Sequence, residues 1–398
     1  MQRDSAVQPA PEPGKSRMPQ LGLRIAIDAR PALWPRTGTG TIAHNILKNI
    51  GGTGQNAEYF AYFDTNPALH LSAYSSIQSR FGGPRQEFLW SNTWLPRQLR
   101  RDNIDVFVTF LDKEIPIFPT RCRVVSMIHD LIPLRFPKIA FRNIAHRLYY
   151  EGLIRAAARR SDVILTNSQF SRREIVSGLG IPEAKIHKIT LGVETPPVID
   201  PAHTQAVLAR YRLARPYAIA LGSTEPRKNN ARVIEAMRRL SLAHPRLRLA
   251  IAGSPWRGVA FDRSLIDARV CLLGHVPDED LPALMSAAEM LVFPSLHEGF
   301  GLPVVEAMAL GVPVVTSNVT ALPEVAGDAA IYADPTSVAD IAAQMNRILT
   351  DRQLAVRLRD KGRERARLFR WETACREITS LCEVLMESSQ WNRQTVTP

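Results

Sequence analysis

Short apolar runs alternate with segments of helical periodicity along most of the chain. The first run, Leu23–Asp28, is followed by a glycine-containing loop at 36–41 and by a helical pattern from Ile42 to Ile50. A strand, a loop and a helix in this order are typical of the start of a doubly wound α/β domain. Further strands are predicted at Glu58–Phe63, Val106–Phe110, Val124–His129 and Val163–Asn167, and helices within 94–101, 138–160 and 168–178. Together these elements predict a parallel sheet in a first domain over residues 21–195.

The alternation breaks near Pro196 and Pro197, so we expect an interdomain linker over residues 196–215. A second series then predicts strands at Tyr217–Gly222, Leu247–Ala252, Val270–Leu273, Met290–Pro294, Val312–Ser317 and Ala329–Ala333, with helices at 229–241, 279–288, 303–310, 336–350 and 353–369. This series indicates a second domain over 216–370, after which a helix at 371–388 should pack back towards the first domain. The predicted fold class is α/β, with two Rossmann-like domains that face each other across a cleft and bind ligands at the carboxyl ends of their strands.

Composition narrows the cellular setting. Residues 1–20 contain charges and prolines but no apolar stretch of the signal-peptide type, so we expect a disordered tail. No segment reaches the roughly 20 apolar residues that a membrane-spanning helix needs. The four cysteines are scattered without metal-ligand spacing, which favours idle thiols in a reducing compartment. We therefore expect a cytoplasmic protein.

A formal net charge of +12 points to anionic partners. Between Arg135 and Arg160 there are seven lysines and arginines and a single glutamate, interleaved with apolar residues at roughly helical spacing. Two interpretations remain open. The basic helix at 135–160 could lie on an acidic membrane, with Arg142, Arg147 and Arg155 on the surface that meets membrane or acceptor, or its basic face could simply be solvated. Nucleic-acid binding is not expected, because the chain has no helix-turn-helix, zinc or RNA-binding signature.

The first chemical motif is Glu225-Pro226-Arg227-Lys228-Asn229, where the first strand of the second domain passes into a helix. Loop N–H groups and a helix N-terminus at such a place favour a phosphate. Arg227 can bind phosphate oxygens in a bidentate manner, and Lys228 adds a point charge. Because an arginine–lysine pair is also common on protein surfaces, this motif alone is weak evidence.

The second motif, residues 293–311, is more specific. Gly299 and Gly301 let the backbone approach a ligand closely, and the helix that follows has a proline in its first turn and a glycine at its C-terminal cap. Glu298 precedes this helix, and Glu306 lies on it among core-type residues. Two carboxylates so placed can accept hydrogen bonds from the hydroxyl pairs of a sugar and a ribose.

The segment from Glu298 to Glu306, with Gly-Phe-Gly-Leu-Pro between them, closely resembles the Glu-x7-Glu motif of glycosyltransferase family 4. Glu225–Asn229, Ser161–Ser171 and Ile128–Pro133 extend the resemblance over most of the chain, and they are most similar to a bacterial O-antigen mannosyltransferase-like subgroup. The resemblance implies a retaining transferase of the GT-B type that uses a nucleotide sugar and needs no metal or other cofactor.

The resemblance also implies a role for each matching residue. Glu306 would hold the ribose, and Arg227 and Lys228 would bind the diphosphate. Glu298 and His129 would act as catalytic residues that contact the donor sugar near the reacting carbon. The remaining donor-binding residues would be Gly38, Gly40, Gly299, Phe300, Gly301 and Leu302. Some relatives carry an arginine where this chain has Gly222, so diphosphate neutralisation would depend more heavily on Arg227 and Lys228.

The subgroup favours GDP-mannose as donor, with a UDP-hexose or another GDP-sugar as the alternative. The acceptor would be a glycan or a lipid-linked saccharide in the synthesis of a cell-surface polysaccharide such as lipopolysaccharide. The protein would be cytoplasmic and would reach this acceptor through peripheral contact with an anionic inner membrane. Two other interpretations stay open: a different enzyme on the same fold, such as an epimerase or a phosphorylase, and a non-catalytic sugar-nucleotide binding protein. The complete set of Arg227, Lys228, Glu298 and Glu306 argues against the second.

Overall fold

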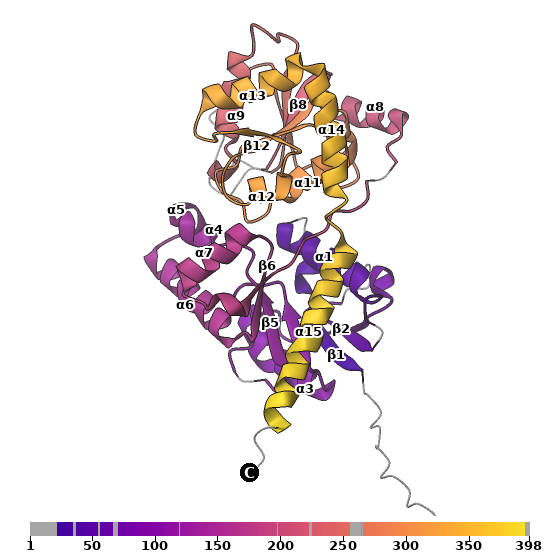
Figure 1. Cartoon of the computed structure of the whole chain (residues 1–398), viewed down its shortest axis with the longest axis vertical. Helices are drawn as coiled ribbons and strands as arrows, with labels where there is room; N and C mark the ends of the chain where they lie inside the picture. Colours follow the sequence, from indigo (N-terminus) through magenta and orange to yellow (C-terminus); the bar gives the residue numbers. More distant parts are fainter. Residues whose placement is uncertain are drawn as a thin grey trace, which may run out of the picture.

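The computed structural model describes residues 22–34, 37–54, 56–66, 71–118, 120–196, 198–222, 225–254, 264 and 266–394. The tail predicted at 1–20 lies outside these residues. Two α/β domains are arranged one above the other, and the chain passes between them twice (Figure 1).

The N-terminal domain is built on a seven-stranded parallel sheet in the order β3-β2-β1-β4-β5-β6-β7. Its strands are β1 (Leu23–Asp28), β2 (Ala57–Phe63), β3 (Gln78–Phe81), β4 (Val106–Thr109), β5 (Arg123–Met127), β6 (Val163–Thr166) and β7 (Ile186–Lys188). Five of them match the predicted strands within a few residues. The pattern misses β3 and β7 because both are short edge strands that keep polar, partly exposed residues.

The helices of this domain are α1 (Gly38–Ile50), α2 (Glu87–Leu89), α3 (Leu95–Arg101), α4 (Ile132–Arg135), α5 (Pro137–Ala140), α6 (Ile144–Arg160) and α7 (Gln169–Leu179). Two expectations are wrong here. The glycine-containing segment expected as a loop is the first turn of α1, because the Thr37 hydroxyl accepts the N–H of Gly40 (3.0 Å) and caps the helix. The continuous basic helix expected over 135–160 is instead divided between α5 and α6, and the Asn143 side chain caps α6 by accepting the N–H of His146.

The C-terminal domain has a six-stranded parallel sheet in the order β10-β9-β8-β11-β12-β13. Its strands are β8 (Tyr217–Leu221), β9 (Arg248–Ala252), β10 (Val270–Gly274), β11 (Met290–Phe293), β12 (Val314–Ser317) and β13 (Ile331–Ala333). Its helices are α9 (Asn230–Arg239), α10 (Leu281–Ser286), α11 (Leu302–Ala309), α12 (Leu322–Ala326), α13 (Val338–Thr350) and α14 (Arg352–Ala366). All the elements predicted for this domain are present, and α12 is an addition. In both sheets the first strand lies between two parallel neighbours, which places a ligand crevice at the carboxyl ends of the central strands.

The two crossings between the domains differ. The segment expected as a linker at 196–215 includes helix α8 (Pro201–Arg210), which packs on α10 of the C-terminal domain. The second crossing leads into α15 (Trp371–Gln394), which lies along α1 (Figure 1). The hydroxyl of Thr379 on α15 is within hydrogen-bond distance of the Tyr59 hydroxyl (2.9 Å) and the Thr53 hydroxyl (3.2 Å). The last helix therefore packs as part of the N-terminal domain.

Candidate functional site

A cavity of about 450 Å³ lies between the domains, at the carboxyl ends of both sheets. We call it the central cavity. Most of the predicted site residues line it: Gly38, His129, Arg227, Lys228, Glu298, Gly299, Phe300, Gly301, Leu302 and Glu306. Gly40 lines a second, adjoining cavity instead, and Arg142, Arg147 and Arg155 line neither.

Glu298 forms ion pairs with two cations on the C-terminal wall of the central cavity. Its carboxylate lies 2.8 Å from Lys228 Nζ and 2.8 Å from a guanidinium nitrogen of Arg227. Burial by itself raises the pKa of Glu298, but the attraction of Lys228 and Arg227 outweighs burial and lowers the pKa to about 2. Glu298 is therefore an anion at neutral pH and can only accept hydrogen bonds.

Arg227 holds the loops of this wall together. Its Nε and one terminal nitrogen donate to the two carboxylate oxygens of Glu225 (2.8 and 3.0 Å), and its other terminal nitrogen donates to the carbonyl oxygen of His297 (2.7 Å). Burial lowers the pKa of Arg227, but the carboxylates of Glu298 and Glu225 raise it by more. Lys228 is the more exposed of the two cations, 17% against 9%, so it is the cation more accessible to a ligand in the cavity.

The N-terminus of α1 faces these cations from the other domain. Thr37, Gly38 and Thr39 line the central cavity, and the N–H groups of a first helical turn carry partial positive charge. A side chain on Gly38 would meet nothing within 4 Å, so there is open space in front of this turn. Positive charge thus lies on both sides of the cavity, an arrangement that suits an anionic ligand.

His129 and Asp130 follow β5 and lie under the loop that carries Glu298. The Nε2–H of His129 donates to the carbonyl oxygen of Phe110 (2.9 Å), which makes Nδ1 the ring nitrogen that can accept from a ligand. A Cβ on Gly299 would lie 2.8 Å from both Asp130 Oδ2 and the carbonyl oxygen of His129. Only glycine therefore lets this loop reach His129. Asp130 was not predicted as a site residue, and its burial raises the pKa of its carboxyl group.

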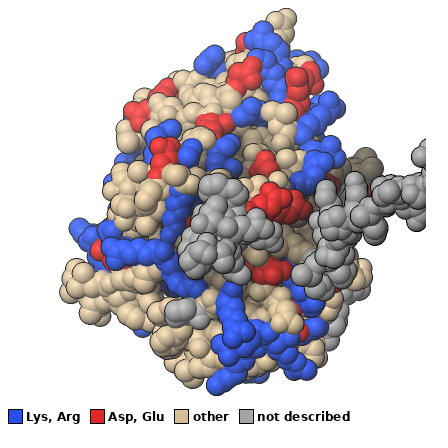
Figure 2. Space-filling view, turned by 60° about the horizontal axis from the view of Figure 1, so that its bottom comes forward, with Lys and Arg blue, Asp and Glu red and all other residues tan. Residues whose placement is uncertain are grey.

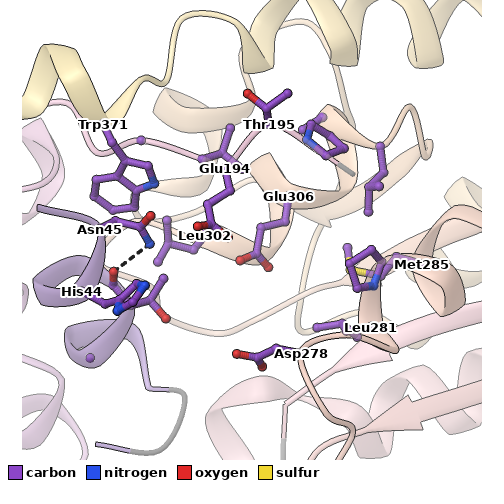
Figure 3. Close-up of a pocket in the computed structure, with 18 of the residues that line it drawn as sticks. His44, Asn45, Glu194, Thr195, Asp278, Leu281, Met285, Leu302, Glu306 and Trp371 are labelled. Atoms are coloured by element: carbon purple, nitrogen blue, oxygen red, sulfur yellow. Dashed lines mark hydrogen bonds between the residues drawn. The ribbon is translucent and has the colours of Figure 1, made fainter. Parts of the chain in front are cut away.

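Glu306 marks the other end of the central cavity. Gly301 takes a φ of +102° and is the N-cap of α11. Glu306 lies on the second turn of this helix and is half-buried. The Glu306 carboxylate points into the space between the domains (Figure 3). It also lines a second cavity of about 370 Å³, bounded by α1, α10, α11 and both interdomain crossings. We call this second space the hinge cavity.

Helix α7 of the N-terminal domain supports the Glu298 loop, a feature that the sequence did not reveal. Glu174 on α7 lies 3.0 Å from His297 Nε2 and accepts a hydrogen bond from Arg135 Nε (2.9 Å). Burial raises the pKa of Glu174, but His297 and Arg135 together lower it by more. The Ser168 hydroxyl at the start of α7 donates to the carbonyl oxygen of Gly299 (2.7 Å). The contacts of α7 with His297 and Gly299 join residues more than a hundred positions apart, so no spacing rule could pair them.

Two of the arginines on α6 already form contacts within the N-terminal domain. Arg155 donates to the carbonyl oxygens of Leu179 (3.1 Å) and Gly178 (3.0 Å) at the end of α7, and Arg147 pairs with Glu151 (2.7 Å). Arg142 is exposed. The apolar side chains of Ile144, Leu148 and Tyr149 are also exposed, each by more than 60%. Lysine and arginine side chains form several separate groups over the lower end of the molecule rather than one continuous patch (Figure 2).

Comparison with protein families gives two matches that cover most of both domains. A model described as Glycosyltransferase Family 4 matches residues 37–196, and one described as Glycosyl transferases group 1 matches residues 211–365. O-antigen chain mannosyltransferase B of Escherichia coli is 36% identical over 272 residues, which cover 66% of this chain and 71% of that protein. The serotype-specific mannosyltransferase WbdA of Escherichia coli is 32% identical over 290 residues, 69% of this chain but 35% of that protein.

Solved structures share the two-domain architecture at low sequence identity. HepE from Anabaena in complex with UDP-glucose superposes with a TM-score of 0.72 at 16% identity, covering 91% of this chain and all of that one. A glycosyltransferase from Rickettsia africae gives a TM-score of 0.70 at 14% identity, covering 92% of this chain and 99% of that one. At these identities the likeness concerns the fold.

Proposed function

Because the chain belongs to glycosyltransferase family 4 and has the GT-B fold, we propose that it transfers mannose from GDP-mannose, with retention of configuration, to a saccharide or lipid-linked acceptor of cell-surface polysaccharide. Glycosyl transfer follows from the family, whereas the donor, the acceptor and the stereochemistry are the proposal. The observation that carries it is the arrangement of charges around the central cavity. Lys228 and Arg227 pair with Glu298 on the C-terminal wall, the N-terminus of α1 lies on the other wall, and Glu306 lies where the central cavity meets the hinge cavity.

A nucleotide sugar would suit this arrangement of charges. Its diphosphate would lie between Lys228 and the N-terminus of α1, its sugar towards Glu298 and His129, and its ribose towards Glu306. Lys228 and α1 belong to different domains, so the bound donor would contact both. The E. coli relatives that are mannosyltransferases favour mannose as the transferred sugar.

Retention would result from attack of the acceptor hydroxyl on the face from which the diphosphate leaves. As the bond between the anomeric carbon and the phosphate oxygen breaks, negative charge grows on the diphosphate, where Lys228 and α1 stabilise it. The leaving phosphate oxygen would take the proton of the acceptor hydroxyl. Glu298 is not proposed as a nucleophile, because Arg227 and Lys228 hold its carboxylate.

The donor is identified by a screen of the purified full-length protein against GDP-mannose, other GDP-sugars and UDP-hexoses. Release of GDP from GDP-mannose, with an α-linked product in the anomeric region of the NMR spectrum, is the expected result. Turnover with a UDP-hexose alone would replace the proposed donor. Tight binding without any turnover would instead favour a non-catalytic binding protein.

We propose that the transfer uses no metal ion, since Lys228 and α1 supply the positive charge that a metal would otherwise give. An Asp-x-Asp sequence does occur at 278–280, but its two carboxylates are separated. Asp280 is buried and binds Arg210 (2.5 Å) and Tyr211 (3.0 Å), whereas Asp278 lines the hinge cavity. Excess EDTA should therefore leave the rate of nucleotide release unchanged, and a loss that Mg²⁺ restores would contradict the proposal.

Replacing Glu306 with alanine should weaken GDP binding by about tenfold, because the ribose hydroxyls lose a charged acceptor worth roughly 1.5 kcal/mol. The KM for the donor should rise by a similar factor, while kcat changes less. Calorimetric titration with GDP and steady-state kinetics measure the two effects. Glu306→Gln is the matched variant, since it keeps one acceptor oxygen and should lose less affinity. Unchanged GDP affinity in both variants would remove Glu306 from the donor site.

We also propose that the N-terminal domain meets the membrane through α6, where Ile144, Leu148 and Tyr149 are exposed next to Arg142. Within the part of the chain that the structure describes, no helix has the length and apolar character to cross a bilayer. A lipid-linked acceptor would then be reached from the membrane surface by contact of this helix.

Changing both Ile144 and Leu148 to glutamate should reduce sedimentation with liposomes that contain acidic phospholipids by about tenfold, because it removes apolar contact and adds negative charge. Arg147 and Arg155 are left intact, since they hold Glu151 and the end of α7. The control changes Val356 and Leu368, which are exposed on the C-terminal domain, to glutamate. Equal sedimentation of the α6 variant and the wild type would support a merely solvated basic face.

A further inference from the structure

Helix α7 begins against the loop of the C-terminal domain that carries Glu298. At this end of the helix the hydroxyls of Ser168 and Ser171 both donate to the carbonyl oxygen of Gly299, over 2.7 and 3.3 Å. Both serines are fully buried, and the Ser168 hydroxyl also caps α7 by accepting the N–H of Ser171 (3.0 Å). A buried hydroxyl that both donates and accepts holds its partners in one arrangement. The residue next to Glu298 is thus tied to the N-terminal domain.

The carboxylate of Glu324, on α12, binds the same end of α7 from a second segment of the C-terminal domain (Figure 1). It accepts the backbone N–H groups of Gln169 (2.8 Å) and Phe170 (3.3 Å), for which the helix itself offers no acceptor. Lys188 Nζ, at the end of β7, lies 3.6 Å from it. A helix N-terminus carries partial positive charge, so this end of α7 attracts the carboxylate. The side chain of Glu324 is 30% exposed, and solvent therefore screens part of the attraction.

The segment that leads into α12 connects Glu324 to the backbone of Glu298. The Thr320 hydroxyl accepts the N–H of Glu298 (3.3 Å), and the N–H of Ala321 donates to the carbonyl oxygen of Glu298 (3.4 Å). Thr320 takes a φ of +64°, a left-handed conformation that a β-branched residue rarely adopts. Such a conformation persists only where the surrounding contacts hold it. Glu298 is therefore fixed to the start of α12, and Glu324 fixes α12 to the N-terminal domain.

We propose that Ser168, Ser171 and Glu324 are positioning residues for the transfer reaction. We call their contacts across the domain boundary the α7 clasp. The clasp holds Glu298 from both sides, through the loop after it and through α12, so that its carboxylate keeps a fixed place relative to the N-terminal domain. His129 belongs to that domain, so the clasp sets the distance between the two groups proposed to contact the donor sugar. The inference rests on the proposed function for the role of Glu298, whereas the clasp itself is a feature of the fold.

Replacing Glu324 with alanine should lower kcat by about 5–20-fold and weaken GDP binding by no more than about threefold, because a displaced Glu298 slows the reaction without removing a nucleotide contact. Glu324→Gln keeps one acceptor oxygen for α7 and should lose no more than about threefold in kcat. Steady-state kinetics and calorimetry with the full-length protein measure both quantities. The matched control is Glu364→Ala, an exposed position on α14. Wild-type kcat in Glu324→Ala, or equal losses of kcat and GDP affinity, would overturn the positioning role.

A second variant approaches Glu298 from the other side of the clasp. Ser171→Ala removes one donor to the Gly299 carbonyl and leaves the cap of α7 in place, since Ser168 supplies it. We expect kcat to fall by about 2–5-fold. Combined with Glu324→Ala, the loss should be smaller than the product of the two single losses, because both side chains act on the same loop. Single losses that multiply in full would mean that the contacts act separately and would contradict the clasp as a unit.

Hydrogen–deuterium exchange of the full-length protein tests the clasp without any turnover. The backbone amides of residues 296–301 should exchange at least about threefold faster in Glu324→Ala than in the wild type, while thermal unfolding verifies that the variant is folded. If exchange is faster but the wild type releases no nucleotide from any sugar donor, the clasp stands and the transfer function fails. If the wild type transfers sugar and the variants match it in both exchange and kcat, the positioning assignment fails alone.

Discussion

Replacing Glu298 with glutamine should lower kcat by about 10²–10³-fold while leaving the affinity for GDP unchanged or higher. A sugar that loses its diphosphate acquires positive charge at the anomeric carbon, and hydrogen bonds from its hydroxyls to a carboxylate strengthen as this happens. An amide in the same place offers no charge. The nucleotide, by contrast, gains from the change, because Lys228 no longer pairs with Glu298 and can turn to the diphosphate.

The two halves of this prediction are measured separately, by single-turnover kinetics with the donor and by titration with GDP. Glu235→Gln provides a matched control, since Glu235 is exposed on α9 and lines neither cavity. A variant that loses GDP affinity and kcat together would indicate that Glu298 only keeps the wall folded. Wild-type turnover would remove Glu298 from the catalytic role.

Replacing Arg227 with methionine should destabilise the protein by about 3–5 kcal/mol, because the buried carboxylate of Glu225 loses its cation and Glu298 loses one of two. Transfer activity should be lost as well, since the carbonyl of His297 and the loop that follows lose their anchor. Urea unfolding with the full-length protein measures the first effect, and nucleotide release measures the second.

A double variant distinguishes the structural from the chemical role of Arg227. Glu225→Leu together with Arg227→Met removes most of the buried charge, and replacement of a buried ion pair by apolar residues is often neutral for stability. We expect the double variant to recover most of the stability but little of the activity. Recovery of both would mean that Arg227 has no part in the reaction, and recovery of neither would mean that the Glu225 pair does not explain the destabilisation.

The central strands were predictable because burial on both faces leaves uniform apolar runs. Tyr217–Leu221 and Met290–Phe293 are fully buried, whereas the missed strands β3 and β7 pair on one side only and keep polar residues such as Gln78 and Lys188. The interruption before α6 was hidden for another reason. α5 ends at Ala140 and Asn143 caps α6, and neither disturbs the spacing of the apolar residues around them.

The site was predictable as a set of residues but less so as a set of contacts. Glu298, Glu306, Arg227 and Lys228 were identified by local motifs, and all four line the central cavity. That Arg227 is committed to Glu225 and His297 depends on packing in three dimensions. Glu174 on α7 was missed because its partner His297 lies in the other domain, and helical periodicity carries no information about such a pair.

The position of α15 has a consequence for exchanging donor specificity between related enzymes. Because Thr379 and its neighbours pack against α1 and Tyr59, a chimera cut once in the first crossing would join an N-terminal half to a foreign last helix. Such a hybrid would have mismatched side chains where α15 packs against α1. A workable exchange takes residues 198–366 from one parent and keeps 371–394 with the N-terminal half, so that the swapped piece is an insertion with two junctions.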